Sequence, residues 1–116
     1  MSKVSPLAPK NGFPALASIA GVRFSNISAG IKYTDRPDVM LAEICEGSSI
    51  AGVFTKSATR SAAVLDCQTK LKSESMSSGA YALVVNSGNS NAFTGTEGFL
   101  AVSKICSNFS KELNIK

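Results

Sequence analysis

The sequence of 116 residues contains no histidine and no tryptophan, and it has three cysteines. Cys45, Cys67 and Cys106 are widely spaced and form no CxxC pair. A zinc site needs close cysteine pairs or histidines, so no metal site is expected. A secreted disulfide scaffold has more cysteines, usually in even number. We therefore expect three small, buried thiols in a reducing compartment.

Long apolar runs are also lacking. The longest strongly apolar run covers residues 81–85, which is far shorter than a membrane span. The apolar stretch that begins at Phe13 is broken at once by Pro14 and has no basic block just before it, so it makes a poor signal peptide. We expect a cytoplasmic protein that has no membrane partner.

Charge of one sign is not concentrated anywhere along the chain. There are 12 basic and 8 acidic residues, and the basic ones are scattered from Lys3 to Lys116. A nucleic-acid surface needs Lys and Arg clustered on one face. The sequence therefore predicts no nucleic-acid partner.

What is present is the composition of a globular domain, 44% hydrophobic and 17% charged. Residues 1–18 contain three prolines and no periodicity, which predicts an extended arm laid over a surface. Residues 20–85 are expected to be mainly strands, and the residues at 62–67 fit either a short strand or the end of a short helix. The stretch 68–79 fits a surface loop or an exposed helix. Apolar patterns predict strands at 20–25, 31–33, 39–45, 50–55 and 80–85, the last of them central in its sheet. By periodicity alone, residues 39–45 also fit a helical turn.

A helix is predicted over residues 95–113 because apolar residues recur there at steps of three and four. Thr94 followed three residues later by Glu97 fits a capping box, with the Thr94 hydroxyl as N-cap acceptor. A strand, a glycine-containing turn and a helix make a βα unit, so the expected fold class is mixed α/β. The apolar face of this helix comprises Phe99, Val102, Ile105, Cys106, Phe109 and Leu113.

The loop between this strand and helix, NSGNSNAFTG at residues 86–95, is the most informative segment. Asn and Gly tolerate left-handed backbone conformations, so the loop is conformationally demanding, and Gly88 is expected to have a positive φ. A loop at a helix N-terminus can bind an anion, but this one lacks the P-loop and GxGxxG spacings. The residues favour a structural turn, with an anion site as the alternative.

The same loop carries a family resemblance. NSGNSNAFTG resembles the NSGNANA-TG signature of ornithine acetyltransferases, although Ser90 stands where alanine is usual. Upstream, AGVFT at 51–55 and SAAV at 61–64 match further stretches of that family in the same order, with Ala63 where proline is common. The resemblance identifies residues 1–116 as the N-terminal part of such an enzyme. The structural signature residues are Gly52, Asn86, Gly88, Asn89, Asn91, Thr94 and Gly95.

The resemblance implies an acyltransferase of arginine biosynthesis that moves an acetyl group from N2-acetylornithine to glutamate. Some members also accept acetyl-CoA as a substrate, and no cofactor is implied. It implies a layered α-β-β-α sandwich that this chain fills only in part. The family's precursor cleaves itself at an Ala-Thr bond, and the freed threonine is the nucleophile, with its own α-amine available as base. The expected partners are the downstream part of the same precursor, including the nucleophile-bearing chain, in a hetero-oligomer.

No catalytic, substrate-binding or metal-binding residue is assigned to this chain. The family's nucleophile lies in an ATM-like stretch and its oxyanion-hole donors in an STGVIG-like stretch, and neither stretch occurs here. The chain alone is therefore expected to be inactive. The alternatives are a small anion-binding module that uses residues 86–95 and a truncated gene product without function. Three carboxylates are expected to be solvated rather than catalytic: Glu43, Glu46 and Asp66.

Overall fold

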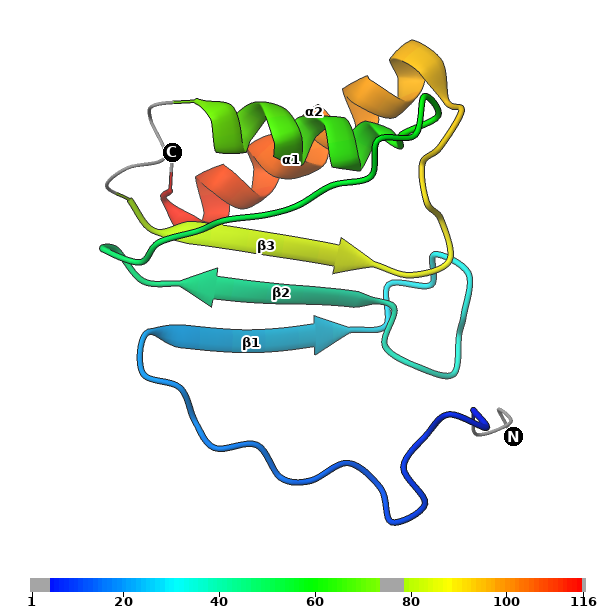
Figure 1. Ribbon diagram of the computed structural model, residues 1–116, viewed down its shortest axis with the longest axis vertical. Helices are drawn as coiled ribbons and strands as arrows, with labels where there is room; N and C mark the ends of the chain where they lie inside the picture. The colour runs from blue at the N-terminus through cyan, green and yellow to red at the C-terminus, as the bar shows by residue number, and fades with distance from the viewer. Residues whose placement is uncertain (1–4, 74–78, 116) are drawn as a thin grey trace.

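The computed structural model describes residues 5–73 and 79–115, which form one three-stranded sheet and two helices (Figure 1). The strands β1 (Val22–Ile27), β2 (Val39–Ile44) and β3 (Tyr81–Asn86) are antiparallel and lie in the order β1-β2-β3. Helix α1 (Ala62–Lys72) lies between β2 and β3 in the sequence, and helix α2 (Gly95–Leu113) follows β3. The predicted mixed α/β class is confirmed.

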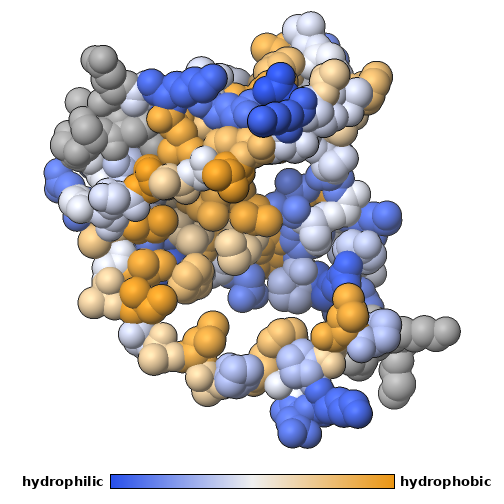
Figure 2. All heavy atoms as spheres, viewed as in Figure 1, coloured by the Kyte–Doolittle hydropathy of each residue, from blue (hydrophilic) through white to orange (hydrophobic). Residues whose placement is uncertain are grey.

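One face of the sheet carries large apolar side chains that are exposed. The register places Phe24, Ala42 and Leu83 side by side on one face. Phe24 is 66% exposed and Leu83 45%, and Figure 2 shows hydrophobic residues gathered over the strands. At one end of the strands, Arg23 and Glu43 line a hollow of about 430 Å³ together with Leu113 at the end of α2. Figure 1 shows both helices beyond the β3 edge of the sheet, so the face that carries Phe24 and Leu83 is apolar and open.

The place of β3 in the sheet corrects one prediction. Residues 80–85 were expected to form a central strand, but β2 is central and β3 lies at an edge. A continuous apolar run usually indicates a strand that is covered on both faces. Here Leu83 and Val85 instead belong to the open face of the sheet.

Both helices have local signals in the sequence. Helix α2 covers the predicted range, and α1 resolves the ambiguous residues 62–67 as helix. Ser61 caps α1, because its hydroxyl accepts a hydrogen bond from the Val64 N–H (3.3 Å). Helix α1 continues to Lys72, so it also takes up the first part of the stretch 68–79, of which residues 74–78 lie outside the described residues.

Two predicted strands, at residues 31–33 and 50–55, are wrong. Residues 31–33 belong to the irregular loop that joins β1 to β2. Residues 50–55 run without regular structure from β2 toward α1, and Val53 is 99% exposed. Alternating apolar residues form a strand only where a neighbouring strand edge can pair with them.

The N-terminal arm is irregular, as predicted, over its described residues 5–18. Its large apolar side chains, Leu7, Phe13 and Leu16, are almost fully exposed. Figure 1 shows the arm running away from the edge of the sheet at β1. The arm therefore covers no surface of this chain, and the expected surface beneath it is not found within the described residues.

Candidate functional site

The loop of residues 86–95, called the Asn/Gly loop below, is held together by its asparagine side chains. Asn86 Nδ2 donates to the carbonyl of Asn89 (2.8 Å), and the Asn91 N–H donates to Asn89 Oδ1 (3.0 Å). Asn91 Nδ2 reaches the first turn of α2 and donates to the carbonyl of Gly98 (3.0 Å). These bonds fix the backbone of the loop and tie it to the start of α2, which supports the structural role predicted for the three asparagines.

Two signature glycines lie where other chain segments approach closely. The positive φ predicted for Gly88 is confirmed at +97°, and a Cβ added there would lie 2.5 Å from the Cβ of Lys32. A Cβ added at Gly52 would lie 3.0 Å from Leu71 Cδ1 of α1. The first glycine lets the β1–β2 loop pack against the Asn/Gly loop, and the second lets the segment before α1 pass close to that helix.

Asp38 connects the Asn/Gly loop to the β1–β2 loop, and the sequence analysis missed it. Its side chain is buried, with Oδ1 accepting from the Ala29 N–H and Oδ2 from the Ile31 N–H (2.6 Å each). Its carbonyl accepts from the Ser87 N–H (2.8 Å). The Ala29 N–H is the main cause that holds the pKa of Asp38 below its ordinary value. The available signal was an aspartate between a loop and a strand, a position where carboxylates often pair with loop N–H groups.

The start of α2 differs from the predicted capping box. Thr94 occupies the N-cap position, but its side chain makes no capping hydrogen bond. Its hydroxyl instead donates to Asn91 Oδ1 (2.8 Å). The chain enters the helix through Phe93 and Gly95, both at positive φ, and Thr94 itself has φ −101° and ψ 2° rather than the extended backbone of a regular N-cap. The predicted cap is therefore wrong, and the first N–H groups of α2 have no side-chain acceptor among the described residues.

A hollow of about 220 Å³ opens beside this loop, where the starts of the two helices meet. The Ala62 N–H at the start of α1 donates to the Asn91 carbonyl (3.2 Å) and joins the two starts. Arg60 is the one charged residue that lines the hollow. The other lining residues are Ala58, Thr59, Ala62, Asn91, Phe93, Thr94, Gly95 and Phe99.

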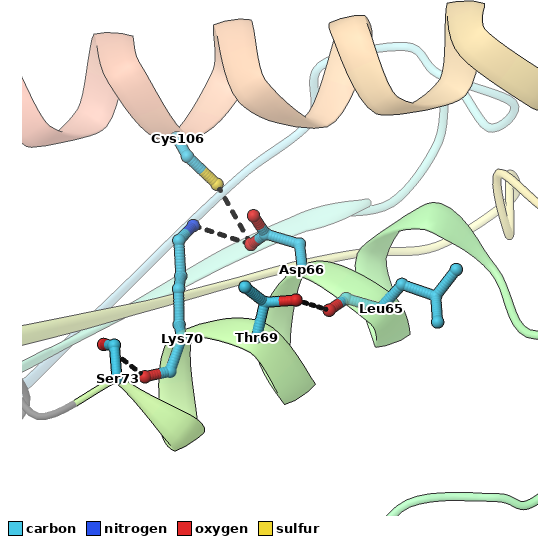
Figure 3. A network of polar contacts seen from close by, with 6 residues as sticks. All are labelled: Leu65, Asp66, Thr69, Lys70, Ser73 and Cys106. Atoms are coloured by element: carbon cyan, nitrogen blue, oxygen red, sulfur yellow. Dashed lines mark hydrogen bonds and ion pairs between the residues drawn. The ribbon is translucent and has the colours of Figure 1, made fainter.

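A polar cluster links α1 to α2 away from this hollow. Asp66 Oδ2 accepts from Lys70 Nζ (2.6 Å) on the same helix and from Cys106 Sγ (3.8 Å) on α2 (Figure 3). Burial, helped by the Asp66 charge, raises the pKa of the neighbouring Cys67 thiol. Asp66 is thus paired rather than only solvated.

Cys45 is exposed and the other two cysteines are half-buried, so the expectation of three buried thiols is also wrong.

The remaining carboxylates have simple surroundings. Glu46 is exposed, as expected, whereas Glu43 forms a cross-strand ion pair with Arg23 (2.5 Å).

Within residues 5–73 and 79–115, no group of three His, Cys, Asp or Glu side chains could hold a metal ion. In the same part of the chain, neither helix has the length and apolar character needed to cross a membrane. The described side chains around the Asn/Gly loop can stabilise a backbone conformation or bind a ligand, but they include no nucleophile that is hydrogen-bonded to a base.

The fold and the loop together define a mixed α/β scaffold that has a packed helix pair, an open apolar sheet face and an ordered Asn/Gly loop. The chain belongs to the ArgJ family, whose model matches residues 23–116. It is 56% identical over 105 residues to the arginine biosynthesis bifunctional protein ArgJ of Ruegeria pomeroyi, which covers 90% of this chain and 25% of that protein. Proteins of the same name are 55% identical over 97 residues in Bradyrhizobium diazoefficiens and 52% over 95 residues in Nitrobacter winogradskyi.

These matches cover most of this chain but little of the relatives. The Bradyrhizobium and Nitrobacter alignments cover 84% and 82% of this chain and 22% of each relative. The chain therefore spans about a quarter of the length of the curated relatives it matches. No solved structure matches it significantly. The family assignment made from residues 51–55, 61–64 and 86–95 is confirmed.

Proposed function

We propose that this chain is the N-terminal part of an arginine-biosynthesis acetyltransferase that transfers an acetyl group from N2-acetylornithine to glutamate. The family match over residues 23–116 is the observation that carries the proposal. The relatives' shared name, arginine biosynthesis bifunctional protein, supports the pathway and is consistent with acetyl-CoA as a second acetyl donor. Cytoplasmic residence follows from this role in amino-acid biosynthesis.

In this proposal the chain supplies scaffold. The sheet with its helices forms one half of a layered α-β-β-α sandwich, and a second sheet from the downstream polypeptide covers the open face that carries Phe24, Leu83 and Val85. Exposed apolar side chains of this size support a missing layer, because covering such a patch lowers the free energy of the protein. The complete enzyme is then a hetero-oligomer of two chains cut from one precursor.

The chemistry in this proposal comes from outside the chain. The nucleophilic threonine and the oxyanion donors belong to stretches that do not occur in these 116 residues. Losing one oxyanion donor alone costs about a hundredfold or more in rate. The isolated chain is therefore inactive, and the Asn/Gly loop acts by fixing the junction between β3 and α2.

A chimera tests this function. The matching segment of the Ruegeria pomeroyi relative is replaced by this chain, and acetyl transfer from N2-acetylornithine to glutamate is measured on the purified product. We expect self-cleavage and turnover within about tenfold of the parent, since the segments are 56% identical. A chimera that folds and cleaves itself but transfers no acetyl group would contradict the proposal.

A further inference from the structure

The hollow beside the Asn/Gly loop is lined by Arg60, whose charge the described part of the chain does not neutralise. Arg60 is half-buried there, and its Nη1 donates to the neutral Gln68 Oε1 (3.0 Å). Arg23 and Lys70 are both ion-paired, but within residues 5–73 and 79–115 no carboxylate lies within ion-pair distance of Arg60. Removing a charge from water without a counter-ion is unfavourable, so this position is suited to an anion.

The hydrogen bonds of Arg60 leave one edge of its guanidinium unused. Because Nη1 is taken by Gln68, the opposite edge, formed by Nε–H and Nη2–H, faces no acceptor in the described part of the chain. This is the edge that can hold a carboxylate by two parallel hydrogen bonds. Nε itself is covered by the chain. Nη2 is therefore the part of this edge that a ligand can reach without a change in the side chain.

The other walls of the hollow suit a ligand that also has an apolar part. Gly95 opens α2 there, and the first N–H groups of that helix have no side-chain cap among the described residues. Phe93 and Phe99 line the hollow, and Phe93 is 88% exposed. A volume of about 220 Å³ admits a small organic molecule.

We propose that this hollow binds a small organic carboxylate. The carboxylate oxygens contact Arg60 and the N–H groups that open α2, and the carbon chain lies against the rings of Phe93 and Phe99. The proposal depends on the charge and shape of the hollow and not on the acetyl transfer, so either can fail without the other. Arg60 was not among the residues that the sequence analysis selected.

Titration of the isotope-labelled chain with sodium butyrate, followed by nuclear magnetic resonance, tests this site. All measurements use the Leu83→Glu background, which replaces an exposed apolar side chain of the sheet and should limit association. Sodium chloride replaces butyrate so that ionic strength stays constant. We expect saturating shift changes at the backbone N–H groups of Gly95 and Thr96 and at Arg60 Nε–H. Inorganic phosphate, which has no apolar part, should bind more weakly.

Variants separate a specific site from general charge attraction. Arg60→Met should weaken butyrate binding at least tenfold, because charge-assisted hydrogen bonds are lost. Arg60→Lys should weaken it severalfold, since the charge remains but the two-pronged edge does not. Arg23→Met, the matched control, removes the same charge from an exposed ion pair and should leave binding unchanged.

Three results would overturn the proposal. The first is a titration of the Leu83→Glu chain with no saturating change at Gly95 and Thr96, a result that does not depend on whether Arg60→Met folds. The second is equal butyrate affinity in Arg60→Met and Arg23→Met. The third is binding of phosphate as tight as that of butyrate, which would point to an anion site without selectivity for carboxylates.

Discussion

At the residue scale, Asp38 makes a pH-dependent contribution to stability. The N–H groups of Ala29 and Ile31 favour its ionised form and lower its pKa in the folded state. A lowered pKa stabilises the fold above the ordinary value of 3.8, and this contribution is lost as pH falls through the folded-state pKa. In a Leu83→Glu background, which should limit association, we expect the free energy of unfolding, measured with urea, to fall less between about pH 5 and pH 2 with Asp38→Asn than with Asp38 present. Asp35→Asn, at an exposed carboxylate of the same loop, is the control, and identical slopes with Asp38→Asn and with Asp38 present would refute this role.

A second residue-scale prediction separates two reasons for glycine at position 88. Gly88 and Gly47 both have positive φ, at +97° and +84°, but only at Gly88 would an added Cβ meet another atom, the Lys32 Cβ at 2.5 Å. Gly47→Ala should therefore cost about 1 kcal/mol from backbone strain alone. Gly88→Ala should cost more, by roughly 1–3 kcal/mol, because the β1–β2 loop must also move. Equal losses in denaturant unfolding would mean that the contact with Lys32 is unimportant.

At the scale of the element, the two helices differ in how they begin. Ser61 accepts a hydrogen bond from the first turn of α1, whereas Thr94 accepts none from α2. Ser61→Ala should lower the free energy of unfolding by about 1 kcal/mol through the lost cap. Thr94→Ala should leave the N–H groups of α2 as they are and act only through the lost bond to Asn91. The reverse order of these two losses would show that Thr94 does cap α2.

The elements also show which parts of the fold could be predicted from sequence. Helix α2 and the strands β1, β2 and β3 have strong periodic or continuous apolar patterns, and these four were predicted near their observed bounds. The predictions at 31–33 and 50–55 failed because the pattern is local, while pairing depends on which edges are available.

Within the candidate site, the need for glycine at position 88 could be predicted, because glycine is the residue that a left-handed turn requires. Asp38 had a local signal, an aspartate between a loop and a strand, but its partners Ala29 and Ile31 could not be read from it. The place of Arg60 could not be predicted, because it depends on a hollow formed where two helix starts meet.

At the scale of the whole molecule, the open sheet face determines how the isolated chain behaves. Exposed Phe24 and Leu83 favour association. We expect oligomers or aggregates in sedimentation velocity, and Leu83→Glu should reduce them. Val53→Glu adds the same charge at an exposed position outside the sheet and should have little effect. A sharp monomer peak with cooperative unfolding in the wild type would instead indicate a self-sufficient module.

The most direct test of the central claim is to reconstitute the enzyme from two separately produced parts. One part is this chain, and the other is the Ruegeria pomeroyi relative without its matching segment. Acetyl transfer from N2-acetylornithine to glutamate is measured for each part alone and after the two are refolded together. The account predicts no transfer by this chain alone, clear transfer by the mixture, and loss of that transfer with Leu83→Glu but not with Val53→Glu. Transfer by the purified chain alone, or none by a mixture that forms a stable complex, would contradict it.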